Sequence, residues 1–237
     1  LGDFVYERKN SEGKFELVPD FSSNVDLTRL IHSGYGQLNG VKGKWNYTAG
    51  LRLEFMDRSL HLKDKANTID STYTYEFVQP YPSANIQYSA NESLKLKAAY
   101  SRRVERTTTF KMNPFPEREH SETLEQGDPS LLPEFIDLVE AGIVKDFGEN
   151  SFYTTAYYRN VKNLVNRVNT IYNDTILNRI YSNVGTGRSL GLEAGIELNP
   201  SSNWKVFTGA NVYQYEIKGQ FDNRPIDTSA WIYSINA

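Results

Sequence analysis

The chain has 237 residues and a net charge of −3, so it allows one large β domain or two small ones and gives no reason to expect nucleic acid as a partner. Cysteine is absent, which excludes disulfide frameworks and thiolate metal sites. No apolar run reaches the roughly 18 residues of a transmembrane helix. A membrane barrel is still allowed, because its strands only alternate apolar and polar side chains.

The alternation of apolar and polar side chains predicts an almost purely antiparallel sheet of about eight to ten strands. No segment shows a sustained helical period. The clearest strand covers residues 45–57, where five apolar side chains share one face: Tyr47, Ala49, Leu51, Leu53 and Phe55. Two further apolar stripes are Leu94, Leu96, Ala98 and Tyr100, and then Leu190, Leu192, Ala194, Ile196 and Leu198. Pro80 and Pro82 lie near the start of another strand, residues 77–89, although a central ladder tolerates proline poorly.

The connections between the expected strands alternate in length. Residues 40–44, 91–93, 148–150 and 199–203 form short turns, whereas 58–72, 105–133 and 219–228 are long and 170–175 is intermediate. Transmembrane barrels alternate short periplasmic turns with long extracellular loops in this way. Several strands also exceed the roughly nine to eleven residues that cross a bilayer. Soluble sandwiches have short, regular strands instead, so the pattern favours a barrel.

The longest connection, residues 105–133, carries four prolines and little periodicity. An irregular connection of this length is uncommon inside a compact domain and is usually functional or disordered. Its motifs are Arg102-Arg103-x-x-Arg106, Asn113-Pro114-Phe115 and Gln126-Gly127-Asp128-Pro129-x-Leu131-x-Pro133-Glu134, followed by a Glu140-x-Gly142 strand.

Together these motifs resemble the outer-membrane β-barrel region of TonB-dependent receptors, most closely the Bacteroidetes-type outer membrane protein beta-barrel family. Residues 35–37, 49–54 and 187–193 add matching pieces, and the resemblance spans residues 31–237. It implies an all-β fold, an antiparallel up-and-down meander of long strands that forms part of a transmembrane-type β-barrel. It also implies a location in the bacterial outer membrane, in contact with lipid.

The function that the resemblance implies is energy-coupled uptake of a scarce nutrient, such as an iron chelate, cobalamin or a glycan. The energy would come from a TonB-type partner that acts on an N-terminal plug domain. We find no plug segment, so residues 1–237 are expected to form one partial barrel domain, truncated at both ends, that does not transport alone. No enzymatic activity, cofactor or metal is expected.

Two other functional classes fit parts of the sequence. One is a soluble antiparallel β module that binds carbohydrate through aromatic loops. The other is a barrel hydrolase that uses Ser189, because residues 187–191 match the G-x-S-x-G form of a nucleophile elbow. An elbow needs a helix after the serine, whereas an alternating strand follows here, so we interpret these residues as a strand.

Charge is unevenly distributed around the long connection. Residues 95–111 carry six bases against one acid, and residues 117–140 carry eight acids against one base. One interpretation is a charged wall that selects a solute, with Arg102, Arg103, Arg106 and Glu134 as candidate ligand-binding residues. The other is mutual pairing inside a polar barrel, and the sequence leaves both open. The carboxylates around His120 are able to hold a hard cation, but an acidic solvated loop is favoured.

The three apolar stripes generate one further expectation. In a whole barrel they would meet lipid, whereas in the isolated piece they would form an apolar patch larger than soluble monomers usually expose. We therefore expect the isolated piece to curl, to self-associate or to require detergent, because its cut edges also offer unpaired backbone groups.

Overall fold

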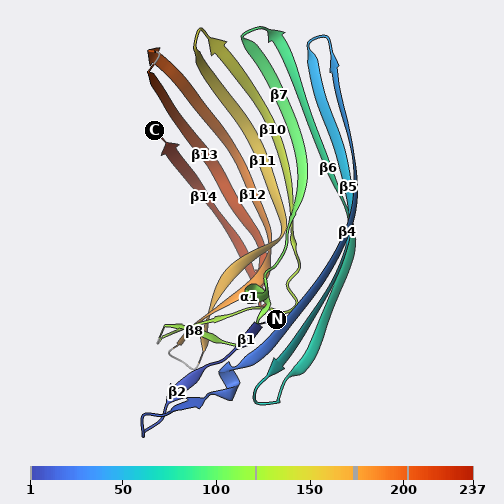
Figure 1. Cartoon of the computed structure of the whole chain (residues 1–237). Helices are drawn as coiled ribbons and strands as arrows, with labels where there is room; N and C mark the ends of the chain where they lie inside the picture. The colour runs from blue at the N-terminus through green and yellow to red at the C-terminus, as the bar shows by residue number, and fades with distance from the viewer. Residues whose placement is uncertain (1, 121, 173–175, 202, 237) are drawn as a thin grey trace.

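The computed structural model describes residues 2–120, 122–172, 176–201 and 203–236, and most of them belong to strands (Figure 1). The long strands are β4 (Ser23–Lys42), β5 (Trp45–Asp64), β6 (Asp70–Asn91), β7 (Leu94–Glu105), β10 (Glu134–Phe147), β11 (Asn150–Tyr172), β12 (Ile176–Ser201), β13 (Trp204–Phe221) and β14 (Arg224–Asn236). The short elements are β1 (Gly2–Phe4), β2 (Glu7–Lys9), β3 (Phe15–Leu17), the 3-10 turn η1 (Pro19–Phe21), α1 (Thr109–Met112), β8 (Glu117–His120) and β9 (Thr123–Gln126).

Ten strands follow one another in a single curved antiparallel sheet, in the order β1-β4-β5-β6-β7-β10-β11-β12-β13-β14. Each long strand pairs with the next one along the chain, so the predicted all-β meander is confirmed. Among the described strands, the one parallel pair joins β9 to β12. Within the described ranges, no helix has the length and apolar character needed to span a membrane.

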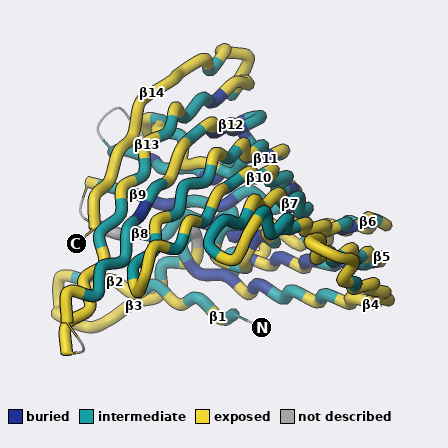
Figure 2. Tube along the Cα trace, turned by 90° about the horizontal axis from the view of Figure 1, so that it is seen from above, coloured by how far each residue is buried: buried dark blue, intermediate teal, exposed yellow. Residues whose placement is uncertain are grey.

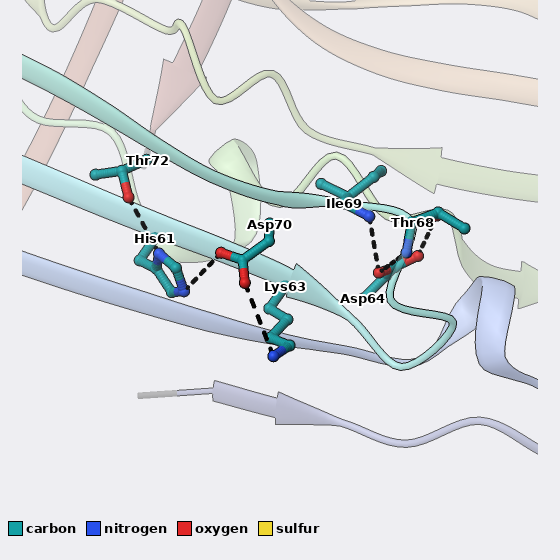
Figure 3. Close-up of polar contacts among 7 residues, drawn as sticks. All are labelled: His61, Lys63, Asp64, Thr68, Ile69, Asp70 and Thr72. Carbon is teal, nitrogen blue, oxygen red and sulfur yellow. Dashed lines mark hydrogen bonds and ion pairs between the residues drawn. The ribbon is translucent and has the colours of Figure 1, made fainter.

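Two predicted loops are wrong, because the strands extend through them. Residues 58–72 belong mostly to β5 and β6, which are joined by residues 65–69 only. The Asp64 carboxylate closes this turn by accepting hydrogen bonds from the Thr68 and Ile69 amides at 2.8 and 2.9 Å (Figure 3). Residues 219–228 form a tight turn at Asp222 and Asn223, both with positive φ. Most of the predicted connection 170–175 lies outside the described residues.

The pairing register of the strands places the three predicted apolar stripes on the same face of the sheet. Residues opposite each other in an antiparallel pair share a face, and one such row runs Tyr47, Ile86, Ala98, Ala141, Ala156, Leu192, Val212 and Tyr233. Leu192 is 48% exposed and Leu51 is 46% exposed. The predicted stripes therefore belong to one continuous apolar face, which we call the outer face.

On β5 the apolar positions change face after Phe55. Outward residues further along this strand are polar, as Asp57, Ser59, His61 and Lys63 are, whereas Met56, Leu60 and Leu62 are buried on the opposite face. The outward apolar band thus covers residues 45–55, close to the roughly nine to eleven residues that a tilted strand needs to cross a bilayer. We call the opposite face of β4–β6, which carries Glu54, Met56 and Arg58, the inner face.

The core lies on the inner face. Val25, Leu60 and Leu62 from β4 and β5 pack there against Met112, Phe115 and Leu131 from the long connection and against Tyr181 from β12. Figure 2 shows buried residues, in dark blue, gathered near the middle of the molecule, while the last strand β14 is exposed along almost its whole length.

The sheet splits between β6 and β7 at the two prolines. Pairing of these strands ends at Ser83 and Ser101, next to Pro82, and from Pro82 back to Asp70 strand β6 is paired with β5 alone. Proline has no N–H to donate to a ladder, and two prolines two residues apart remove donors from the same edge. Across this seam the rings of Phe77 and Phe135 meet edge-on, with centroids 5.7 Å apart.

The outer face predicts a contrast between two neighbouring substitutions in the full-length protein. Leu192→Lys places a charge in the apolar band and should lower the free energy of unfolding in lipid vesicles by about 2–4 kcal/mol at mid-bilayer depth. Glu193→Lys changes the opposite face of the same strand and should cost much less. Urea titration followed by tryptophan fluorescence compares them, and equal losses would show that the band does not face lipid.

Candidate ligand site at the seam

Residues 106–133, which we call the inner segment, lie against the inner face and are held by arginines of β4 and β5 (Figure 1). Arg58 of β5 is 2% exposed, and its Nη1 donates to the Leu131 carbonyl at 2.7 Å and to Thr107 Oγ1 at 3.3 Å. Arg29 of β4 donates from Nη2 to the Thr107 carbonyl at 2.6 Å. Arg58 therefore joins both ends of the inner segment to the wall.

The same segment is attached to the other side of the sheet by asparagines and by β9. Asn183 of β12 accepts from the Leu132 amide at 2.8 Å and donates back to the Leu132 carbonyl at 3.1 Å. Asn163, at a register shift of β11, donates to the Pro133 carbonyl at 3.2 Å. Glu125 of β9 forms an ion pair with Arg167 at 2.9 Å. The inner segment is thus a strut between β4–β5 and β11–β12.

A cluster of charged side chains lies beside the strut. Glu54, 2% exposed, pairs with Arg106 at the start of the inner segment and lies 3.5 Å from Arg52 Nη2. The Arg52 guanidinium also stacks over the Tyr81 ring, with 4.7 Å between Cζ and the ring centroid. Such stacking on an aromatic face fixes the plane of a guanidinium and leaves its edge free for other partners.

A hollow of about 380 Å³ opens at the upper end of the seam, where β4, β5, β6 and β7 meet. Three arginines contribute to its wall together with hydroxyl and amide groups: Arg52, Arg102 and Arg103, then Tyr35, Tyr81, Ser83, Ser101 and Gln37. The remaining lining residues are Gly36, Gly50 and Leu51, so no carboxylate lines the hollow. At Gly50 a Cβ would approach Ser83 Oγ to 3.0 Å, so glycine keeps this wall open.

Arg102 is held from one side. Its Nε lies 3.9 Å from Asp137 Oδ1, a long ion pair, and its Cζ lies 5.6 Å from the centroid of the Phe135 ring. Tyr100 donates from its hydroxyl to the same Asp137 oxygen at 2.8 Å. Asp137 is thus shared, and among the described residues the Arg102 side chain makes no hydrogen bond.

The four sequence candidates are separated by the structure. Arg102 and Arg103 line the hollow, and Arg106 lies next to it in its ion pair with Glu54. Glu134 lies apart and accepts from the Val165 amide at 2.6 Å, which fixes the register shift of β11. Sequence reasoning missed Arg52 and Tyr81, although both follow from the alternation: Arg52 shares the face of Glu54, and Tyr81 pairs with Arg52.

Ser189 and the two histidines with described side chains, His32 and His61, lie on three different strands. Ser189 lies in the middle of β12, opposite Arg159 and Tyr215, so the interpretation of residues 187–191 as strand is confirmed. His61 is hydrogen-bonded to Thr72 at 3.1 Å, and its Nε2 lies 3.5 Å from Asp70 Oδ1, at the β5–β6 end (Figure 3). The side chain of His120 lies outside the described residues. Elsewhere in the described ranges, no three His, Asp or Glu side chains gather to hold a metal.

The chain belongs to the outer membrane protein beta-barrel family, whose model matches residues 2–237. Solved structures with this fold include the copper transporter OprC, with a TM-score of 0.62 and 15% identity over 93% of this chain and 33% of that one. A search of curated protein sequences finds no significant match.

Two siderophore receptors share the fold as well. PiuA from Acinetobacter baumannii gives a TM-score of 0.58 at 16% identity, covering 90% of this chain and 29% of that one. PirA from Pseudomonas aeruginosa gives 0.55 at 15%, covering 90% and 49%. The chain therefore spans between 29% and 49% of the length of these solved structures.

Loss of the Arg58 guanidinium should release the strut. In Arg58→Met the buried Leu131 carbonyl loses its donor, which costs about 1–3 kcal/mol. The full-length variant should show faster amide exchange across residues 106–133, with the strand ladders of β10–β13 unchanged. Arg188→Met is the matched control, because Arg188 is half exposed and lies 3.9 Å from Glu216. Equal amide exchange rates across residues 106–133 in both variants would show that Arg58 does not hold the inner segment.

Glu117 predicts a pH dependence for the same segment. Burial raises the pKa of this carboxyl and Glu125 raises it further, while a hydrogen bond from Asn113 acts in the opposite direction. The folded segment thus favours the protonated form, so its stability is greatest below the unfolded pKa and falls as pH rises through the raised value. Amide protection factors, which correct for the intrinsic effect of pH on exchange, should lose this dependence in Glu117→Gln, whereas Glu122→Gln, at an exposed position, should retain it.

Proposed function

We propose that this chain is part of the barrel wall of a receptor in the bacterial outer membrane that takes up a small solute by TonB-type energy coupling. Membership of an outer-membrane barrel family supports the location, and the fold shared with a copper transporter and siderophore receptors supports the class. The whole chain would be one partial barrel domain within a longer protein.

The observation that carries the proposal is the contrast between the two faces of β5. Its outer face is apolar over residues 45–55 and polar beyond, whereas its inner face carries Glu54 and Arg58, both 2% exposed, in contact with the inner segment. A strand that meets lipid along one band and a polar interior on the other face is typical of a membrane barrel. A soluble carbohydrate-binding module has no need for such a band.

The coupling to an energy source is the finer part of the proposal. In this class of receptor the barrel encloses a plug that an inner-membrane partner displaces, so the wall needs a polar interior that the plug and ligand can contact. The inner face of β4–β6 and the hollow at the seam offer such a surface. A small molecule or a glycan fits this role, and lipid would cover the outer face.

The test uses the full-length protein in its own cells. The proposal predicts that the protein is recovered in the outer-membrane fraction and that cells lacking its gene accumulate less of at least one labelled solute. The panel comprises iron as catecholate, hydroxamate and carboxylate chelates, copper(II), cobalamin and oligosaccharides. A protonophore should remove the difference, because TonB-type coupling uses the proton gradient.

Three results would contradict this proposal. Recovery of the protein in the soluble fraction would exclude the barrel. Equal accumulation of every solute with and without the gene would exclude uptake of these solute classes. A gene-dependent uptake that persists with the protonophore would exclude energy coupling while leaving a passive channel.

A further inference from the structure

The hollow at the seam is lined by hydrogen-bond donors and positive charge but by no acid. Three guanidiniums, four hydroxyls and one amide side chain line it, and no carboxylate does. Arginine is a donor only and stays charged at all physiological pH values. Any group that enters the hollow therefore meets donors in a positive field.

Part of this donor set has no hydrogen-bond acceptor among the residues that the structure describes. Among the described residues, nothing accepts a hydrogen bond from Arg52 Nε, Arg102 Nε or the Tyr81 hydroxyl, all three of which are buried atoms. Tyr81 itself is only 5% exposed and forms part of the lining. A buried donor without an acceptor costs about 1–3 kcal/mol. Arg29, Arg58 and Arg106 also have a buried Nε without an acceptor among the described residues, so this part of the molecule holds more donors than acceptors.

The acids nearby are already engaged. Glu54 is shared between Arg106 and Arg52, and Asp137 between Tyr100 and Arg102. Behind them Arg29 and Arg58 donate to neutral carbonyl and hydroxyl groups of the inner segment, so their charges are not cancelled by these contacts. With Arg103 included, six guanidiniums thus face two carboxylates in the cluster, which leaves an excess of positive charge.

We propose that the hollow binds an oxyanion group of the ligand, a carboxylate or a phosphate, between the guanidiniums of Arg52 and Arg102. The chemistry is the same for both groups, because a guanidinium presents parallel N–H donors to two oxygens. The inference rests on the proposed uptake function and names the chemical class of its solute. The volume of about 380 Å³ suits a small ligand or one end of a larger one.

Binding to the purified full-length protein in detergent tests the inference without knowledge of the natural solute. Succinate and inorganic phosphate are the probes, and succinamide is the neutral counterpart of succinate. Isothermal titration calorimetry at low salt should show that at least one anion binds and that succinamide does not. Arg52→Gln and Arg102→Gln should each weaken the anion about tenfold or more, because hydrogen bonds to charged groups contribute roughly 1.5–3 kcal/mol.

Two further variants separate binding from folding. Ser83→Glu leaves every arginine in place but puts a carboxylate into the hollow, so it should abolish anion binding in a protein that still folds. Arg188→Gln removes an arginine from β12 that lies outside the hollow and should bind the anion like the unchanged protein.

The outcomes distinguish this inference from the proposed function. If no anion binds, or if binding is equal in the unchanged protein and in Arg52→Gln, Arg102→Gln and Ser83→Glu, the oxyanion site is wrong. The inference is equally wrong if no anion binds because acidic side chains from the rest of the barrel already occupy the arginines. The uptake and localisation experiment stands independently, since its result does not require that the solute be an anion.

Discussion

The structure depends first on one buried cation. Arg58 lies on the inner face of β5, and its guanidinium reaches Thr107 and Leu131, near the two ends of the inner segment. A buried charge is stable only when hydrogen bonds satisfy it, and here a carbonyl, a hydroxyl and the ring of Tyr75 surround it. The irregular segment is thereby closed into a loop on the wall, and its apolar residues complete the core with Leu60 and Leu62.

The alternation of side chains along each strand explains why the sequence predicts the strands and their apolar face. The stripes led by Leu51, Leu96 and Leu192 share a face, because register transmits the alternation from strand to strand. The same rule explains the errors. After Phe55 the apolar residues of β5 move to the inner face, since there the inner segment and not lipid covers the strand. The sequence alone does not show that the inner segment covers this part of β5, so residues 58–72 were predicted to be a polar loop.

The candidate site was harder to predict because it depends on contacts between distant segments. Arg102 and Arg103 stood out through charge alone, but Arg52 and Tyr81 required the pairing of β5 with β6. Glu134 was grouped with the arginines only by its place in a motif, and its carboxylate caps the Val165 amide instead. Pro80 and Pro82 indicate from the sequence that pairing is interrupted on β6. They do not indicate whether β6 loses its pairing with β5 or with β7.

The seam and the hollow follow from the same two prolines. Because β7 leaves β6 at Ser101, Arg102 has no partner on β6, and Arg52 and Arg102 both line the hollow that opens there. A closed ladder would have placed backbone hydrogen bonds where the hollow now lies. The end of pairing between β6 and β7 therefore weakens the sheet locally and exposes the arginines of the hollow. The inner segment, attached to β5 through Arg58, holds β5 in place beside this opening.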